Sequence, residues 1–559
     1  MKKIAMRSVR AALQLIPKNL KNKLKQNERL TGLYVRSVRK SGLFFDAPTP
    51  KQTQALFNYW LEVNEPAFSK SITNIGEWQA VIFGTDNQGV TEASIKTLGA
   101  KTCLITGELA LGAIEQKISL LDDRLPTLLL NGGDLLESTA IYHLFEALKG
   151  NDLVYCDTDE LSSNGTKTSP RFLPSWNPEL QYSTGYINSG VMIKTSRLKS
   201  LHISNQTTIA EVITELSLSI DGLVVNHMPL PLVHLSVTEN NEAKSLERVK
   251  MVIERHSKAT VELDEKFNVN RLCWPNTNPL VSLIIPTKNG KTLVKACIES
   301  ILEKTTYKNY EILLIDNGSD EQESIEYFDY LDTLDKVRVL RYPAPFNYSA
   351  INNFGVEHAR GSILGLVNND IEVISPNWLT YMVGHVERES VGCVGAKLLY
   401  SDTRIQHAGV VLGYGGGAGH AHKNFPRSHA GYLNRIVATN NYSAVTAACL
   451  LVKRAHFDAV HGLNEKNLSV AFNDVDFCLK VKSLGVQNVY CAEAELFHHE
   501  SVSRGLDISP EKAARFNREL SFLQTTWRAF IKCDPAYNPN LTLKRENFSI
   551  KNAAELKIE

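Results

Sequence analysis

The sequence lacks the features of a secreted or membrane-spanning chain. Its nine cysteines are scattered, odd in number and never spaced as Cys-x-x-Cys, which favours reduced thiols in a cytosol over a disulfide framework. No apolar run approaches the roughly 20 residues that span a bilayer. The N-terminus resembles a signal peptide, but Arg7 and Arg10 interrupt its short apolar part and no small-residue cleavage site follows. We therefore expect a cytoplasmic protein.

The sequence also lacks a large net charge. The net charge is +1, with 43% hydrophobic and 22% charged residues, which is typical of a globular protein and argues against general binding of nucleic acid. However, residues 1–41 carry about a dozen Lys and Arg and one Glu. This basic, leucine-containing segment suits an anionic membrane surface, where each basic residue is worth about 1 kcal/mol. A solvated helix packed on its own protein is the open alternative.

A chain of 559 residues is too long for one core, so at least two domains are expected. Between 42 and 245, short apolar runs end in turn residues and alternate with helical signals, which predicts an α/β domain. A charged stretch over 246–278 is interpreted as a connector, and a second α/β domain is predicted over 279–507. A helix and a polar tail are expected over 508–559.

A weak internal repeat links the two predicted α/β domains. Leu128–Asp134 (L-L-L-N-G-G-D) resembles Gly365–Asp370 (G-L-V-N-N-D), and the segment that begins at Gly185 resembles the one that begins at Asn441. The order of the two pairs is the same in both halves. We interpret the first half as a worn copy of the second, without counterparts of the strand V-S-L-I-I-P-T-K-N and of the motif N-D-V-D.

Polar residues follow two predicted strands of the second domain. Pro286 ends a continuous apolar strand that begins at Val281, and Thr287 and Asn289 come after it. Asp316 and Asn317 follow the next strand. Open α/β sheets bind ligands at the carboxyl ends of their strands. The Asp316 carboxylate can accept the imide N–H of a uracil or thymine, and a turn or helix-capping role is the alternative.

A third strand ends in Asn368, Asn369 and Asp370. One carboxylate that reaches a divalent ion, with phosphate and water oxygens completing the shell, is a usual way to hold Mg²⁺ or Mn²⁺ beside a nucleotide. Asn and Asp also form ordinary turns. His498 and His499 leave a later strand and are candidate metal ligands, or else an exposed pair. Arg504 could meet a phosphate or only solvent.

The motif N-D-V-D opens a predicted helix at Asn473. We expect the helix N-terminus to keep Asp474 ionised, which would make it available as a base. Asp476 is assigned the alternative role of capping the helix. The glycine-rich segment from Gly413 to His420 lacks the Gly-Lys-Ser/Thr of a P-loop and is interpreted as a flexible loop near the acceptor. His407 is placed on the same side.

Taken together, these motifs resemble the family 2 glycosyltransferases, inverting enzymes of the GT-A fold, over residues 279–505. A subgroup from bacterial polysaccharide and O-antigen gene clusters, many of whose members are called rhamnosyltransferases, shares P-F-N-Y-S-A-I-N-N, I-Q-H-A-G-V-V-L-G, S-A-V-T-A-A-C-L-L-V and H-H-E-S-V-S-R-G. The resemblance implies nucleotide positions at Thr287, Asn289 and Asp316. It also implies that Asp370 is the last carboxylate of the D-x-D-type metal motif and that Asp474 is the base.

The resemblance implies a metal-dependent, inverting transferase that uses Mg²⁺ or Mn²⁺. It would move a sugar, rhamnose being one candidate, from a nucleoside-diphosphate sugar to a hydroxyl of a growing or lipid-linked bacterial surface glycan. The alternative is a non-catalytic glycan-binding or scaffolding protein built from decayed transferase domains. Asp316, Asp370 and Asp474 argue against it in the second half. In the first half Asp134 and Asp157 remain, and we expect no second active site there.

Overall fold

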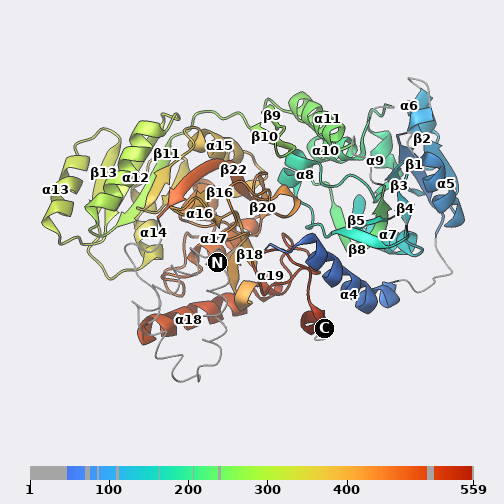
Figure 1. Ribbon diagram of the computed structural model, residues 1–559. Coiled ribbons are helices and arrows are strands. Elements are labelled where there is room, and N and C mark those ends of the chain that lie inside the picture. Colours follow the sequence, from blue (N-terminus) through green and yellow to red (C-terminus); the bar gives the residue numbers. More distant parts are fainter. Residues whose placement is uncertain are drawn as a thin grey trace. The chain divides into compact units, whose positions relative to one another are not determined.

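The computed structural model describes residues 47–68, 76–84, 87–108, 113–162, 164–204, 207–236, 241–499 and 509–556. The basic segment 1–41 lies outside these residues. The chain divides into two compact units (Figure 1). The first unit contains Pro48–Leu272 and Pro535–Glu559, and the second contains Cys273–Asp534. The end of the described chain therefore belongs to the unit at its beginning.

The second unit is built on a ten-stranded sheet. The strands are β11 (Val281–Thr287), β12 (Tyr310–Asp316), β13 (Val337–Arg341), β14 (Ile363–Val367), β15 (Ile371–Val373), β16 (Val391–Leu399), β17 (Ile405–His407), β20 (Asn440–Tyr442), β21 (Cys449–Lys453) and β22 (Gln487–His498). Their order is β13-β12-β11-β14-β21-β16-β22-β15, with β17 beside β16 and β20 beside β22. A hairpin of β18 (Val410–Leu412) and β19 (Ala418–His420) lies apart from this sheet.

Strand β11 shows why this sequence forms a central strand. It lies between β12 and β14 and is parallel to both, as the continuous apolar run predicts. Alternate side chains point to opposite faces, so Val281, Leu283 and Ile285 join the main hydrophobic cluster. Ile284 points the other way, toward Gly355, where an added Cβ would lie 2.5 Å from it. Both faces of the strand are therefore covered.

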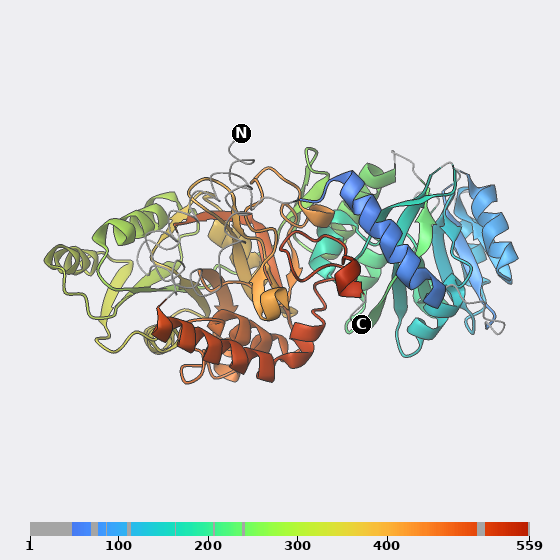
Figure 2. The same ribbon diagram turned by 60° about the horizontal axis from the view of Figure 1, so that its bottom comes forward.

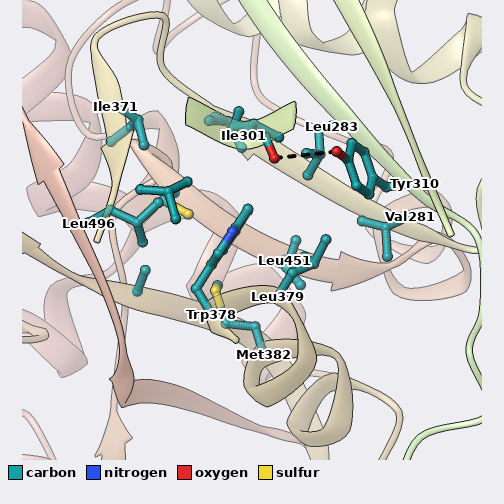
Figure 3. Close-up of a cluster of buried hydrophobic side chains, with 14 of the residues drawn as sticks. Val281, Leu283, Ile301, Tyr310, Ile371, Trp378, Leu379, Met382, Leu451 and Leu496 are labelled. Carbon is teal, nitrogen blue, oxygen red and sulfur yellow. Dashed lines mark hydrogen bonds between the residues drawn. The ribbon is translucent and has the colours of Figure 1, made fainter. Parts of the chain in front are cut away.

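Helices cover the two faces of the second sheet. The main cluster joins the strands to α12 (Lys291–Lys304), α13 (Gln322–Leu331) and α15 (Trp378–Val386). Figure 3 shows Trp378 at its centre, with Met382 and Leu379 of the same helix beside it. The Trp378 indole is fully buried and donates a hydrogen bond of 3.1 Å to Thr305. Helix α14 (Tyr348–His358), capped by the Asn347 side chain, covers the other face.

The remaining helices of the second unit follow β21 and β22. They are α16 (Arg454–Ala459), α17 (Asn473–Lys482), α18 (Pro510–Thr526) and α19 (Arg528–Lys532). Helix α17 begins at the N-D-V-D motif, as the sequence predicts.

The first unit is built on an eight-stranded sheet. The strands are β1 (Gln79–Phe83), β2 (Thr102–Ile105), β3 (Pro126–Asn131), β4 (Leu135–Leu136), β5 (Leu153–Leu161), β6 (Lys167–Arg171), β7 (Val191–Lys194) and β8 (Val225–Leu235). Their order is β2-β1-β3-β7-β5-β8-β4, with β6 beside β5. The helices are α4 (Pro50–Phe68), α5 (Gln88–Thr97), α6 (Ala113–Ser119), α7 (Ala140–Leu148), α8 (Pro178–Thr184), α9 (Thr195–Lys199), α10 (Ile209–Ser219), α11 (Asn241–His256) and α20 (Ala553–Leu556).

The region interpreted as a connector, 246–278, has structure of its own. It contains most of α11 and a two-stranded sheet of β9 (Thr260–Asp264) and β10 (Val269–Cys273). Helix α11 packs on α10 of the first unit. The described part of the polar tail packs on the first unit. Its helix α20 contacts α4, as both views show (Figures 1 and 2).

The two sheets follow the same path. The first-unit order β2-β1-β3-β7-β5-β8-β4 corresponds strand by strand to β12-β11-β14-β21-β16-β22-β15. The pairings also agree in direction: β3–β7 and β14–β21 are antiparallel, whereas β5–β8 and β16–β22 are parallel. The predicted internal repeat is thus a repeat of fold.

This correspondence corrects one prediction. We expected the first unit to lack a counterpart of the strand that begins at Val281, but β1 occupies that position, parallel to both β2 and β3. The sequence comparison missed it because β1 (Q-A-V-I-F) is short and does not end in Thr-Lys-Asn.

No helix in the part of the chain that the structure describes is long and apolar enough to cross a membrane.

Candidate active site

The ends of β11, β12 and β14 meet at one edge of the second sheet. Thr287, after Pro286 on β11, is in register with Asp316 on β12. On the other side, the Asn369 Nδ2 donates a hydrogen bond of 3.0 Å to the Thr287 Oγ1. The structure therefore brings together the three strand ends that the sequence predicted as a nucleotide site.

Asp316 is buried, and its two carboxylate oxygens have different partners. Its Oδ1 accepts hydrogen bonds from the Ser319 backbone N–H, at 2.9 Å, and from the Ser319 hydroxyl. Its Oδ2 forms an ion pair with Arg341, which is in register with it on β13. Asp316 thus has the turn-forming role that we kept as an alternative. The pairing with Arg341 was not predicted, because nothing in the sequence gives the register between β12 and β13.

Asn289 and Asn317 brace the loops around this edge. The Asn289 Oδ1 accepts hydrogen bonds from the backbone N–H groups of Asp320, at 2.9 Å, and Glu321, at 3.1 Å. The Asn317 Nδ2 donates to the carbonyl oxygens of Tyr342 and Ala344, at 2.9 and 2.7 Å. Nucleotide contacts stay a prediction for both residues. In the structure, their amide groups hold the loops at this edge in place.

Asp370 and His498 face each other across the sheet edge. Ile371 is in register with His498 on β22, so the preceding Asp370 Oδ1 lies 3.1 Å from the His498 Nε2. Asp370 is only 7% exposed, and its Oδ1 accepts no hydrogen bond from the described residues. Burial acts to raise the pKa of Asp370, but the two nearby histidines, His498 and His499, outweigh it and lower the pKa. A buried, ionised oxygen without a hydrogen bond is costly unless a cation meets it.

Hydrogen bonds fix the orientation of the His498 ring. Its Nδ1 lies 2.6 Å from the Gln406 Oε1, and the Asn368 Nδ2 lies 3.1 Å from its Nε2. In the tautomer with the proton on Nδ1, the Gln406 oxygen accepts from the ring and the Nε2 accepts from Asn368, beside the Asp370 carboxylate. Gln406 was not predicted, although it stands in the motif I-Q-H-A-G beside His407.

His499 is directed elsewhere. Its Nδ1 lies 2.7 Å from the Ser401 Oγ, and its Nε2 lies 3.2 Å from a Glu372 carboxylate oxygen. Of the two histidines predicted as candidate metal ligands, only His498 directs a ring nitrogen at the Asp370 carboxylate.

Asp474 is the second residue of α17. Its Oδ2 accepts a hydrogen bond of 3.2 Å from the Ala447 backbone N–H, and its Oδ1 accepts one of 2.9 Å from that of Val475. The residue keeps some exposed surface, but protein surrounds its carboxylate, and this burial outweighs the hydrogen bonds and raises the pKa of Asp474. We expected the helix N-terminus to dominate. A raised pKa makes the carboxylate the stronger base, provided that it is ionised.

Tyr348 connects the Asp370 motif to the Asp474 loop. Its hydroxyl lies 3.2 Å from the Asn368 Oδ1 and 3.1 Å from the Ala447 carbonyl oxygen. Ala447 in turn donates its backbone N–H to Asp474. The predicted metal motif and the predicted base are therefore parts of one site, although about a hundred residues separate them in the sequence.

Asp476 does not cap α17. Its Oδ1 accepts a hydrogen bond of 2.8 Å from the Trp527 indole N–H, and no side chain caps this helix. The capping prediction is wrong because Phe472, in the left-handed region at φ 60°, turns the chain into the helix instead.

His407 and His420 lie close together, with their Nδ1 atoms 2.8 Å apart. His407 is fully buried and burial lowers its pKa well below the usual range, so it offers no surface to an acceptor. Arg504, a predicted phosphate contact, lies outside the described residues.

The residues at this edge fit a divalent cation. The Asp370 Oδ1 and the His498 Nε2 lie 3.1 Å apart, and a carboxylate and an imidazole are both suitable ligands for Mn²⁺. Within the described residues, no three His, Cys, Asp or Glu side chains gather as a complete metal site. Phosphate and water oxygens would have to supply the remaining ligands.

A carboxylate after a central strand of an α/β sheet, here Asp370 after β14, with a second carboxylate at a later helix start, is the arrangement of a GT-A glycosyltransferase. Residues 282–458 match the family model described as Glycosyl transferase family 2. This part of the chain belongs to that family, and the predicted family and fold class are confirmed.

Two curated relatives extend well beyond this domain. The uncharacterized protein y4gI of Sinorhizobium fredii is 41% identical over 446 residues, covering 76% of this chain and 49% of the relative. The O-antigen biosynthesis protein RfbC of Myxococcus xanthus is 30% identical over 421 residues, covering 72% of this chain and 32% of the relative. The chain thus spans half or less of the length of these relatives.

Among solved structures, the mannosyltransferase PcManGT of Pyrobaculum calidifontis, in complex with GDP-Man and Mn²⁺, is 14% identical. It has a TM-score of 0.34 and covers 46% of this chain and 71% of that chain. At this TM-score, no argument rests on the likeness.

Proposed function

We propose that the second unit transfers a sugar from a nucleoside-diphosphate sugar to a hydroxyl of a growing glycan, with inversion at the anomeric carbon. The observation that carries this proposal is the continuous connection from Asp370 and His498 through Asn368, Tyr348 and Ala447 to Asp474. It supports a cation site and a base that act together within the glycosyl transferase domain.

The donor would lie along the carboxyl ends of β11, β12 and β14. Thr287 and Asn369 line this edge, and Asp316 is held in place by Ser319 and Arg341. Asp370 and His498 would hold Mg²⁺ or Mn²⁺ against the diphosphate. When bound, the ion would supply positive charge for the departing nucleoside diphosphate.

Asp474 would act as the general base. It takes the proton of the acceptor hydroxyl while that oxygen forms a bond to the anomeric carbon and the bond from that carbon to the diphosphate breaks. Attack from the face opposite the leaving group inverts the configuration. No covalent bond between sugar and protein is required.

A bacterial surface glycan is the acceptor that we propose, with rhamnose as one candidate sugar. The O-antigen biosynthesis role in the name of the Myxococcus relative supports a glycan of this kind. A lipid-linked glycan would bring the reaction close to a membrane, and residues 1–41 are the segment proposed to bind an anionic membrane surface.

The non-catalytic alternative fits the first unit better than the second. The Asp134 carboxylate, which follows β3, accepts hydrogen bonds from the backbone N–H groups of Asn131, at 2.9 Å, and Ser236, at 3.1 Å, and from the Ser189 hydroxyl. We therefore propose that this unit does not transfer sugar and that it positions the acceptor or supports the second unit.

Thermal-shift measurements test the donor and the metal together. UDP-, dTDP- and GDP-linked sugars would be added with Mn²⁺, with Mg²⁺ or with EDTA. Binding to the folded state stabilises it by about 2.7 kcal/mol at a ligand concentration of 100 times Kd. At least one donor should stabilise the protein only with the divalent ion, and Asp370→Ala should lose this response. An unchanged ion-dependent response in Asp370→Ala would exclude the proposed metal role.

A further inference from the structure

Helix α18 makes contacts on both sides of Asp474 that the proposed reaction does not yet use. Before Asp474, the Glu519 Oε1 accepts hydrogen bonds from the Ser469 hydroxyl, at 2.8 Å, and the Val470 backbone N–H, at 3.0 Å. The Glu519 Oε2 accepts one of 2.9 Å from the Ala471 backbone N–H. Glu519 is only 2% exposed. A buried carboxylate with three such donors is a strong anchor for a loop.

The anchored loop leads directly into α17. Phe472, which turns the chain into the helix, packs its ring against Phe516 of α18, with centroids 5.3 Å apart. After Asp474, the Trp527 indole at the end of α18 donates to Asp476 at 2.8 Å. Figure 1 labels both helices. Helix α18 and its C-terminal cap, Trp527, therefore hold both the loop before α17 and the first turn of α17, from residue 469 to residue 476.

The same helix also holds the glycine-rich loop that we placed near the acceptor. The Gln524 Nε2 donates a hydrogen bond of 2.7 Å to the Gly416 carbonyl oxygen. A Cβ at Gly417 would lie 2.8 Å from the Leu520 side chain, so this loop approaches α18 closely.

We propose that Glu519 is a positioning residue that fixes the place of the Asp474 carboxylate. This inference rests on the proposed role of Asp474 as the base. The donor groups Thr287 and Asp370 lie on other elements, so loss of the Glu519 anchor should leave the donor site intact. It should instead displace the start of α17 and with it the Asp474 carboxylate.

Glu519→Gln is the sharpest change. Glutamine has nearly the same shape, but one oxygen becomes an NH₂ group that must face a backbone N–H. A misplacement of about 1 Å can reduce turnover about 10²-fold, so kcat should fall by about that factor, with the donor Kd unchanged. Glu511→Gln is the matched control, because Glu511 is an exposed residue in the first turn of the same helix.

The pH profile separates positioning from general destabilisation. The hydrogen bonds from Ala447 and Val475 favour the ionised form of Asp474. If α17 shifts, the bond from Ala447 lengthens and the pKa of Asp474 rises. The acidic limb of the kcat profile in Glu519→Gln should therefore move to higher pH, whereas a lower fraction of folded enzyme would scale the profile without moving it.

Hydrogen exchange provides a readout that needs no ligand. The amides of Val470 and Ala471 should exchange faster in Glu519→Gln than in the natural protein or in Glu511→Gln. If Glu519→Gln does not fold, Trp527→Phe takes its place, because it removes the N–H directed at Asp476, keeps an aromatic ring and leaves the Glu519 anchor intact. Trp527→Phe should lower kcat and move the acidic limb of the pH profile in the same directions, by smaller amounts.

The 559-residue chain is assayed with the nucleotide sugar that gives the largest ion-dependent thermal shift. Turnover and pH profile like those of Glu511→Gln would overturn the positioning role, provided that Asp474→Asn is inactive. If Asp474→Asn itself retains full transfer, the proposed base is wrong and this inference fails with it. The two failures are therefore distinguishable.

Discussion

The two units follow the same strand path but treat the carboxylate after the third strand in opposite ways. Asp134 in the first unit accepts hydrogen bonds from Asn131, Ser189 and Ser236. Asp370 in the second unit leaves one oxygen without a hydrogen bond from the described residues. A satisfied buried carboxylate stabilises a fold, whereas an unsatisfied one is available to a ligand. We therefore propose that this position is structural in the first unit and chemical in the second.

The facing histidines repeat this contrast. His234 is in register with Leu135, as His498 is with Ile371. His234 pairs with Asp159 through its Nδ1, and its Nε2 lies 3.6 Å from Glu137. His498 instead has a neutral partner, Gln406, on its Nδ1. The two carboxylates raise the pKa of His234, whereas His498 has an amide on its Nδ1 and places its Nε2 beside Asn368 and Asp370.

The helix before the last long strand differs in the same sense. Helix α10 begins with a capping box, in which Thr208 and Glu211 satisfy each other's backbone. Helix α17 begins with no side-chain cap and carries Asp474 at its second position. The first unit thus satisfies the Asp134 carboxylate and the start of α10 internally, whereas the second leaves the Asp370 Oδ1 without a hydrogen bond from the described residues and the start of α17 without a side-chain cap.

The largest effect should come from Asp474→Asn. Asparagine keeps the shape but cannot take the proton, so turnover should fall by about 10²–10⁴-fold with little change in donor affinity. Steady-state transfer and donor calorimetry measure the two quantities. If only Asp476→Asn abolished turnover, the base would be two residues further along. Transfer that persists in Asp474→Asn and is lost on adding Asp134→Ala would show that the first unit is a second enzyme.

The stabilities of the two units should change in opposite directions as the pH changes. Burial acts to lower the pKa of His234, but Asp159 and Glu137 outweigh it and raise the pKa to about 9. This stabilisation, about 3 kcal/mol, is fully present below pH 6.5 and is lost as the pH rises toward 9. Burial instead lowers the pKa of His407, so the second unit should lose stability as the pH falls below about 6.5.

Hydrogen exchange in β8 and β17 at pH 5.5, 7 and 9 reports on each unit separately. Protection of β8 that does not decrease between pH 7 and 9 would contradict a charged His234. In His234→Gln the pH dependence of β8 should disappear, while that of β17 should remain.

Asp134→Ala should reduce stability without reducing transfer. It leaves the donors of Asn131, Ser189 and Ser236 without a partner, which should cost the first unit about 2 kcal/mol or more. Asp370→Ala is the matched change in the second unit and should reduce ion-dependent donor binding with a smaller effect on stability. Urea unfolding and sugar transfer of the two variants should give this reciprocal pattern. Loss of transfer in Asp134→Ala with unchanged unfolding would refute the division of roles.

The smallest effect should come from Asn540→Ala in the C-terminal segment. The Asn540 side chain accepts a hydrogen bond of 3.1 Å from the Trp60 indole and donates one of 2.8 Å to the Pro229 carbonyl oxygen. Their loss should lower the free energy of unfolding of the first unit by about 1 kcal/mol. The exposed Asn517→Ala in α18 is the control. Equal unfolding curves for the two variants would show that the segment contributes little.

The sequence predicted the parts of the site that continuous segments encode. An apolar run that ends in Thr287, an Asn-Asn-Asp after a strand and an acidic helix start are each visible within ten residues. The predictions failed or stopped where a partner comes from a distant segment. Strand register brings Arg341 and Gln406 to the site, and packing of the later helix α18 brings Glu519. Neither strand register nor the packing of a distant helix has a local signature in the sequence. Asp476 was misassigned because its partner, Trp527, lies about fifty residues away.

The discontinuous make-up of the first unit has a consequence during synthesis. Its sheet leaves the ribosome early, but Asn538, which binds the buried Asp157, and Asn540, which binds Trp60, are translated only after the whole second unit. At roughly 5–20 residues per second, this delay is on the order of ten to fifty seconds. The nascent first unit must therefore wait with the Asp157 carboxylate held, among the described residues, only by the Leu173 N–H and His227 while the second unit folds, and chaperones would have that interval in which to act on it.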